Sequence, residues 1–190
     1  MYKISFNHSN FLNLSLDMKK LMFTIGRALG GVKEFQSYPW DNKSLVKCWV
    51  DIGASFIKVE GLEQTKAPDI TTWNRSHLVL SPVAYKAIGL DLEPYGEFLT
   101  ITIDGEAYKV FNCLNVVEVD SSQSKSDIVN EQWMGIKSIG FPKDTIDNNL
   151  IFKTKFDRCG SLYCGEALKE MVERHKLKGV NFLDNLTEDF

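Results

Sequence analysis

The chain has 190 residues, of which 44% are apolar, 25% charged and 12% aromatic. This composition is typical of a globular domain and excludes a wholly disordered, collagen-like or coiled-coil chain. The formal net charge is -3, with 22 Lys and Arg against 25 Asp and Glu. The overall basic field of proteins that wrap nucleic acid is therefore absent, and we expect no nucleic-acid partner. We expect one domain over residues 1–190, long enough to fold without a disulfide or a metal.

The beginning of the chain predicts a cytoplasmic protein. Residues 1–8 contain one lysine with no apolar segment behind it, and polar residues interrupt the stretch from Phe11 to Phe23. This pattern is typical of neither a signal peptide nor a membrane span, so no membrane partner is expected. The cysteines lie in apolar or strand-like surroundings, where free cysteine behaves as a small apolar residue. They are Cys48, Cys113, Cys159 and Cys164.

The N-terminal third mixes strand and helix patterns. Apolar residues alternate over 2–6 and 12–16, which predicts two strands. Helical spacing follows from Met18 to Leu29, and the glycines there indicate a short helix. The other elements that we expect in this third are a turn at 38–42, strands at 45–50 and 54–59, and a loop at 64–69.

The middle of the chain has the clearest local signals. A short strand at Leu78–Leu80 precedes a helix that Ser81 caps and that Pro82 begins, because proline has no N–H to leave unpaired there. The alternating runs 99–103 and 107–111 flank Asp104-Gly105. That pair predicts a two-residue hairpin turn, since both of its positions need positive φ. Leu99, Ile101 and Ile103 should then face the core.

The C-terminal part predicts further strands around one helix. Ser121 to Lys125 has the polar composition of a surface loop. The helix from Glu166 to about Lys176 places Leu168, Met171, Val172 and His175 on one face. The strands expected here are 135–141, 149–154, 162–164 and 180–182. Together these elements predict an α+β fold, a mostly antiparallel sheet with a few short helices packed on it.

A search for catalytic or metal-binding motifs predicts none. The glycine-rich stretch 26–33 lacks the Gly-Lys-Ser/Thr ending of a phosphate loop, which favours a turn. Cys159 and Cys164 have no second pair of ligands for zinc, because only His8 and His77 remain besides His175. No motif accompanies any of the three histidines, although a triad assembled from distant residues stays open. We therefore predict no catalytic residue, no metal and no cofactor.

Three tryptophans occur in polar segments that we interpret as loops. They are Trp40, Trp73 and Trp133, whereas Trp49 lies in an expected strand and should belong to the core. Aromatic side chains on loops are typical anchors of protein interfaces. The alternative for each tryptophan is that it folds back over the edge of the sheet.

From Leu78 onward the sequence resembles a family of bacterial immunity proteins, the one numbered eleven among those of polymorphic toxin systems and formerly a domain of unknown function. The resemblance is strongest between Leu78 and Phe111, where it includes Leu-Val-Leu-Ser-Pro-Val-Ala-Tyr-Lys-Ala at 78–87 and Leu-Glu-Pro-Tyr-Gly-Glu-Phe-Leu at 92–99. Further similar segments are 105–112, 117–120, 150–153, 162–164 and 177–182, with weaker ones at 11–14, 26–29 and 68–70. The part that matches best is 76–190, and the stretch from Lys33 to Ala67 has no counterpart.

The resemblance implies a non-enzymatic inhibitor in the bacterial cytoplasm. Such a protein binds the toxin domain of an effector used in interbacterial competition, for example one delivered by type VI secretion, and occludes its active site. Two other classes stay open, a small hydrolase-like enzyme and a module that binds a protein other than a toxin. A toxin gene directly upstream would favour inhibition, and turnover without a partner would favour the enzyme.

Loop aromatics and acidic groups are the candidate interface with the toxin. Each tryptophan pairs a large rigid surface with a charge, which suits both affinity and fast encounter. An acidic tail could also occupy the basic cleft of a toxin that acts on nucleic acid, although a solvated terminus is the simpler interpretation. The candidate residues are Trp40, Asp41, Trp73, Arg75, Glu131, Trp133, Asp184, Glu188 and Asp189. The sequence predicts neither the toxin's chemistry nor the oligomeric state.

Overall fold

A six-stranded sheet forms the centre of the computed structural model, which describes residues 1–188. The strand order is β2-β3-β6-β7-β5-β4, and every neighbouring pair is antiparallel except β3 and β6. The strands are β2 (Asn13–Leu16), β3 (Ile52–Ile57), β4 (Ile70–Trp73), β5 (His77–Leu80), β6 (Gly96–Ile103) and β7 (Glu106–Cys113).

The remaining strands form two smaller antiparallel sheets. The four-stranded sheet has the order β10-β11-β1-β12 and brings the two ends of the chain together. Its strands are β10 (Ile151–Phe152), β11 (Tyr163–Cys164), β1 (Tyr2–Phe6) and β12 (Val180–Leu183). The two-stranded sheet consists of β8 (Lys125–Val129) and β9 (Gln132–Ser138). The predicted α+β fold with mostly antiparallel sheet is thereby confirmed.

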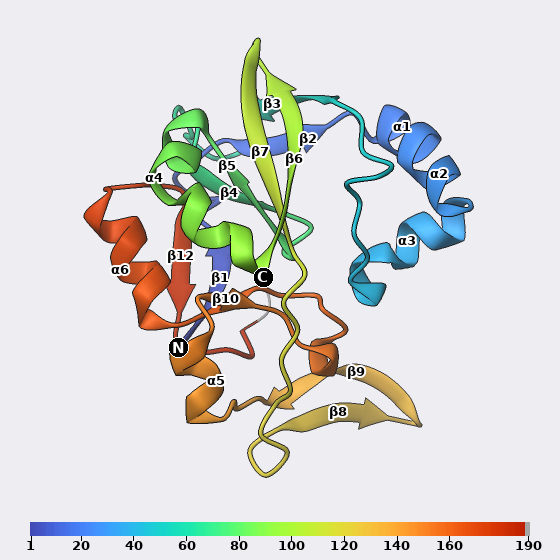
Figure 1. The fold of residues 1–190 in the computed structure, drawn as a ribbon, viewed down its shortest axis with the longest axis vertical. Helices are drawn as coiled ribbons and strands as arrows, with labels where there is room; N and C mark the ends of the chain where they lie inside the picture. The colour runs from blue at the N-terminus through green and yellow to red at the C-terminus, as the bar shows by residue number, and fades with distance from the viewer. Residues whose placement is uncertain (189–190) are drawn as a thin grey trace.

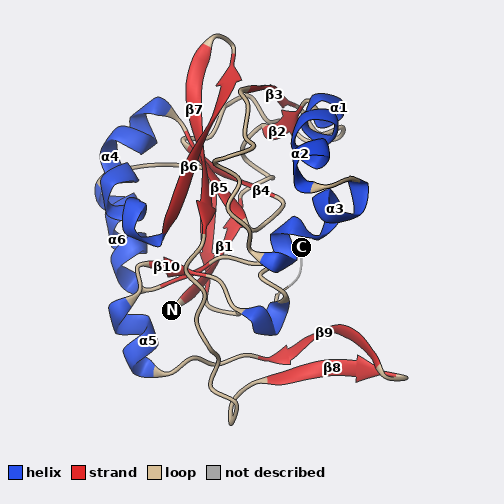
Figure 2. Ribbon diagram, turned by 45° about the vertical axis from the view of Figure 1, so that its right-hand side comes forward, coloured by secondary structure: helices blue, strands red, loops and turns tan. Residues whose placement is uncertain are grey.

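Short helices cover both sides of the strands (Figure 2). One side carries α4 (Pro82–Leu92), α5 (Lys143–Asn148) and α6 (Glu166–Arg174). The other side carries the N-terminal helices, which are α1 (Met18–Leu21), the π-helical η1 (Met22–Gly26), α2 (Arg27–Leu29) and α3 (Val32–Asp41). Two single 3-10 turns are η2 (Glu93–Tyr95) and η3 (Lys155–Asp157). No helix within residues 1–188 is long and apolar enough to cross a membrane.

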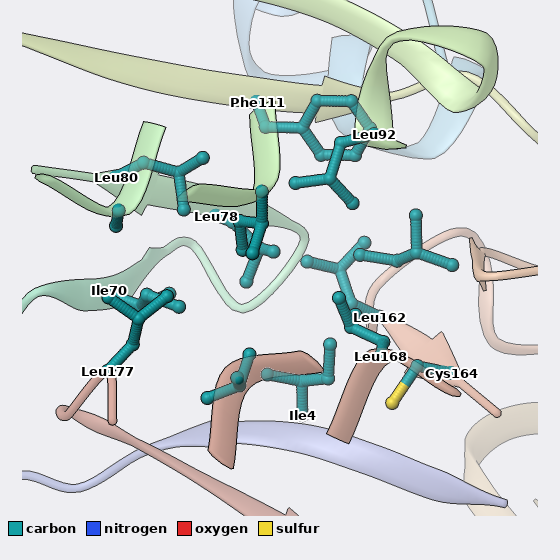
Figure 3. Packing of buried hydrophobic residues seen from close by; sticks show 14 of the residues in the cluster. Ile4, Ile70, Leu78, Leu80, Leu92, Phe111, Leu162, Cys164, Leu168 and Leu177 are labelled. Carbon is teal, nitrogen blue, oxygen red and sulfur yellow. The ribbon is translucent and has the colours of Figure 1, made fainter. Parts of the chain in front are cut away.

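Two main hydrophobic clusters lie on opposite faces of the central sheet. The first is enclosed by this sheet, the four-stranded sheet, α4 and α6, and it includes Ile4, Leu78, Phe111 and Leu168 (Figure 3). The second holds the N-terminal helices against the other face. Its members include Leu21, Ile25, Phe35, Tyr38, Leu99, Ile101 and Val110. Burial of these apolar side chains is the main source of stability for both layers.

The local signals in the middle of the chain gave correct elements. Asp104 and Gly105 adopt φ of 51° and 84° in the turn between β6 and β7. Leu99, Ile101 and Ile103 are buried, as the alternation predicts. Ser81 caps α4 by accepting a hydrogen bond from the N–H of Ala84 at 3.2 Å.

Several expected elements in the N-terminal third are wrong. Residues 38–42 form no separate turn, because α3 continues through Pro39 to Asp41, and Asn42 caps it with a left-handed φ of 48°. Residues 45–50 form no strand, since the N–H of Leu45 donates to the Glu97 carboxylate instead of to a neighbouring strand. Trp49 follows a turn there, although it does pack against the second cluster as expected.

The sequence patterns also missed elements elsewhere. They assign no strand to β4 or β8 and no helix to α5. His175, expected on the apolar face of the last helix, is exposed beyond the end of α6. His77 is the first residue of β5 and is fully buried, so this strand begins one residue before the expected Leu78.

Candidate protein-binding surfaces

Trp73 is a core residue and not a loop anchor. It is the last residue of β4 and is only 7% exposed. Its ring packs against His77 at a centroid distance of 4.9 Å and against Trp49 at 6.2 Å. The interpretation of this segment as a loop is wrong, because strand pairing with β5 turns Trp73 into the second cluster. Arg75 is exposed in the following turn and does not share a surface cluster with this ring.

Trp40 and Asp41 do lie together on the surface. They belong to the last turn of α3, where Trp40 is 55% exposed. Asp41 forms an ion pair with Lys43 at 3.0 Å, and both charged side chains are about half exposed to solvent. The pair therefore presents a large aromatic surface beside a salt bridge.

Glu131 and Trp133 lie on the β8–β9 hairpin, with Glu131 in its tip. The tip residues Asn130 and Glu131 both have positive φ, 49° and 65°, as a two-residue hairpin turn requires. The Trp133 ring faces the body of the protein, where the Arg158 guanidinium lies 4.5 Å from the ring centroid. Trp133 is consequently half-buried and Glu131 exposed.

The C-terminal tail is attached to the first strand. The Lys3 ammonium donates a hydrogen bond to the carbonyl of Glu188 at 2.7 Å. The side chains of Asp184 and Glu188 are exposed, while Asp189 lies outside the described residues. The predicted residues thus belong to separate elements, namely α3, the turn after β4, the hairpin and the tail, and Trp73 drops out of the set.

Exposed apolar side chains mark two surfaces that sequence reasoning did not single out. The β8–β9 hairpin exposes Ile128 at 59% and Met134 at 61%. The N-terminal helices expose Met18, Met22 and Phe23 on the side away from the core. In both cases the sequence places apolar residues on the side of the element that faces solvent. This pattern can be read only when the side that faces the core is known, and the tertiary structure shows that side.

A buried polar row crosses one end of the central sheet. His77, Asn112 and Glu97 are opposite one another on β5, β7 and β6. Asn112 Nδ2 donates to Glu97 Oε1 at 2.9 Å, and the fully buried Lys153 ammonium lies 3.4 Å from Asn112 Oδ1. Burial lowers the pKa of His77, and the positive charge of Lys153 lowers it further.

This row attaches the N-terminal helices to the sheet. Glu97 accepts hydrogen bonds from the Ser44 hydroxyl and the Leu45 N–H, both at 2.5 Å. Asn112 also donates to the carbonyl of Lys43 at 3.0 Å. His77, Asn112 and Lys153 are buried, and the row positions the segment after α3 through these hydrogen bonds. Within residues 1–188, no group of three or more His, Cys, Asp or Glu could hold a metal ion.

Comparison of the sequence with protein-family models finds no match, and comparison with curated proteins finds none either. The functional argument therefore depends on the surfaces described above.

Proposed function

We propose that this protein is a bacterial immunity protein that binds a cognate toxin domain and occludes its active site. The observation that carries the proposal is the β8–β9 hairpin, which extends from the body of the molecule as an arm (Figure 1). A protruding arm with apolar side chains at its end can enter a concave partner. We further propose that the protein works in the cytoplasm of the bacterium that makes the toxin.

The arm has the features of a protein-binding element. Within the described residues, β8 and β9 pair only with each other, so the outer edge of each strand has unpaired backbone groups. Such edges can accept a strand from a partner. Ile128, Val129 and Met134 add apolar surface, and the Glu131 carboxylate adds a negative charge at the tip. A basic active-site cleft is complementary to that charge.

The base of the arm is fixed, which reduces the entropy that binding must overcome. Ser138 Oγ donates to the carbonyl of Gln123 at 2.8 Å, and Ser124 Oγ accepts from the N–H of Gly140 at 3.0 Å. The Arg158 guanidinium over the Trp133 ring holds the inner face. The arm is therefore presented in one orientation.

An enzyme is the less supported alternative. His77 and Cys113 both lie near the Lys153 ammonium, and all three residues are buried. Burial raises the pKa of the Cys113 thiol to about 11, which leaves it protonated and weakly nucleophilic near neutral pH. The burial of these groups therefore favours a protein-binding function over a catalytic one.

The test is binding to the product of the neighbouring toxin gene, together with rescue of cells that express that toxin. The variant Ile128→Ser/Met134→Ser removes apolar surface from the arm, and we expect it to weaken binding by about 2 kcal/mol or more and to abolish rescue. The matched control is Leu90→Ser on α4, whose side chain is 79% exposed. Failure of the wild-type protein to bind the toxin, or equal binding by the arm variant and the control, would contradict the proposal.

A further inference from the structure

The helical segment from Met18 to Leu29 has apolar side chains on two faces. Leu21 and Ile25 point into the second hydrophobic cluster and are fully buried. Met18, Met22 and Phe23 point to solvent, and Phe23 is 72% exposed. A helix that packs against the core with a single face normally has polar residues on its opposite face. The apolar residues on the outer face here therefore indicate a second contact.

The outer face forms a shallow, open groove. A groove of about 570 Å³ lies between this segment and the start of α3, and its residues are Met18, Lys19, Met22, Phe23, Gly26, Arg27, Gly31 and Val32. Gly26 allows α3 to approach closely, because a Cβ there would lie 3.3 Å from the Cβ of Phe35. Gly26 and Gly31 also leave the groove open, since neither has a side chain to fill it.

The charged residues that line the groove are both cations. Lys19 and Arg27 line it, and among residues 1–188 no acidic residue does. Lys20 is directed elsewhere, with its ammonium donating to the carbonyl of Asp51 at 2.8 Å. The Glu34 carboxylate lies beside Gly30 and Gly31, and Gly31 is one of the residues that line the groove. A partner that covers the apolar residues would therefore place its own polar groups next to two cations.

We propose that this groove binds an acidic amphipathic helix of another protein. Apolar side chains spaced three and four residues apart would enter the hollow between Phe23 and Val32, and carboxylates beside them would pair with Lys19 and Arg27. A groove of this volume accommodates several large side chains. This site is separate from the β8–β9 arm and does not depend on the proposed toxin inhibition.

The site can be tested with a defined peptide. The probe is a fluorescein-labelled helical peptide of about 18 residues, roughly five turns, with Leu and Phe on one face and Glu on the other. We expect saturable binding to the full-length protein, measured by fluorescence anisotropy. Phe23→Ser and Arg27→Glu should each weaken it at least about 10-fold. The controls Leu90→Ser and Lys86→Glu, both on the exposed side of α4, should bind as the wild type does.

A second peptide and three further results decide whether the proposal stands. A peptide with Lys in place of Glu should bind at least about 10-fold more weakly, and equal binding of the two peptides would contradict the charge argument. Absence of peptide binding by the folded wild-type protein would refute the site. A dimer in sedimentation that Phe23→Ser converts to monomer would assign the groove to a second copy. Binding to vesicles with anionic lipid that Phe23→Ser abolishes and the acidic peptide does not compete would assign it to a membrane.

Discussion

The buried ammonium of Lys153 donates a hydrogen bond at 3.0 Å to the Oδ1 atom of Asn42, although the two residues are 111 positions apart in the sequence. Asn42 is the C-cap of α3, and Lys153 follows β10 directly. The contact joins the N-terminal helices, which carry the groove, to the part of the chain that leads into the four-stranded sheet. Burial lowers the pKa of Lys153, and the nearby ionisable groups of Cys113, Cys159, Asp157 and Glu97 act in the opposite direction.

Removal of Lys153 should therefore destabilise the fold. We expect Lys153→Ala to lower the free energy of unfolding by about 3 kcal/mol, because it leaves a cavity and unpaired amide oxygens. Lys153→Met keeps most of the side-chain volume and removes a charge that is costly to bury, so it should cost at least about 1 kcal/mol less. Urea denaturation measures both. Equal losses for the two variants would show that packing around this side chain matters little.

The buried His77 should make stability depend on pH. Burial and the charge of Lys153 hold the pKa of His77 well below 6.5, so the folded state keeps this ring neutral while the unfolded state binds a proton below pH 6.5. The unfolded state then gains protons as the pH falls, and between pH 7 and pH 5 this residue should cost about 2 kcal/mol of stability. Denaturation at several pH values should show that His77→Gln loses this part of the pH dependence. The exposed His175→Gln serves as the control, and an unchanged slope in His77→Gln would contradict the argument.

Two strand glycines should respond differently to alanine. A Cβ on Gly96 would overlap the carbonyl oxygen of Asn112 and lie 2.9 Å from ring carbons of Phe111. We expect Gly96→Ala to cost about 2 kcal/mol, because the close pairing of β6 with β7 would have to open. A Cβ on Gly53, in β3, would meet no described atom within 4 Å. Gly53→Ala should be neutral or slightly stabilising in thermal unfolding, and a similar loss in both variants would show that the close approach at Gly96 is not what limits substitution there.

Alanine variants of Trp73 and Trp40 should differ in stability, because the first ring is in the core and the second is on the surface. Trp73→Ala removes a ring from the second cluster and should lower the free energy of unfolding by about 3 to 5 kcal/mol. Trp40→Ala removes a half-exposed ring at the end of α3 and should cost less than about 1 kcal/mol. If Trp40 contributes to the toxin interface, the same variant should weaken toxin binding while its melting temperature stays close to that of the wild type. Strong destabilisation by Trp40→Ala would show that its ring belongs to the core.

Short-range chemistry decided the elements that were predicted correctly. Asp104-Gly105 can turn because both residues accept positive φ, and the apolar alternation on either side then determines which side chains face the core. Ser81 with Pro82 starts a helix through interactions within four residues.

Only the tertiary structure decided the N-terminal third and the candidate surfaces. Pro39 and its polar neighbours favour a turn locally, but Phe35 and Tyr38 bury their rings in the second cluster, and this packing outweighs the helix-breaking effect of proline. Residues 45–50 have a strand composition, yet the N–H of Leu45 donates to the carboxylate of Glu97, which belongs to a distant part of the chain. Trp73, Phe23 and Ile128 are all large apolar residues in partly polar segments. Their sequence neighbours cannot tell which of them is buried, because burial depends on the elements that pack against each one.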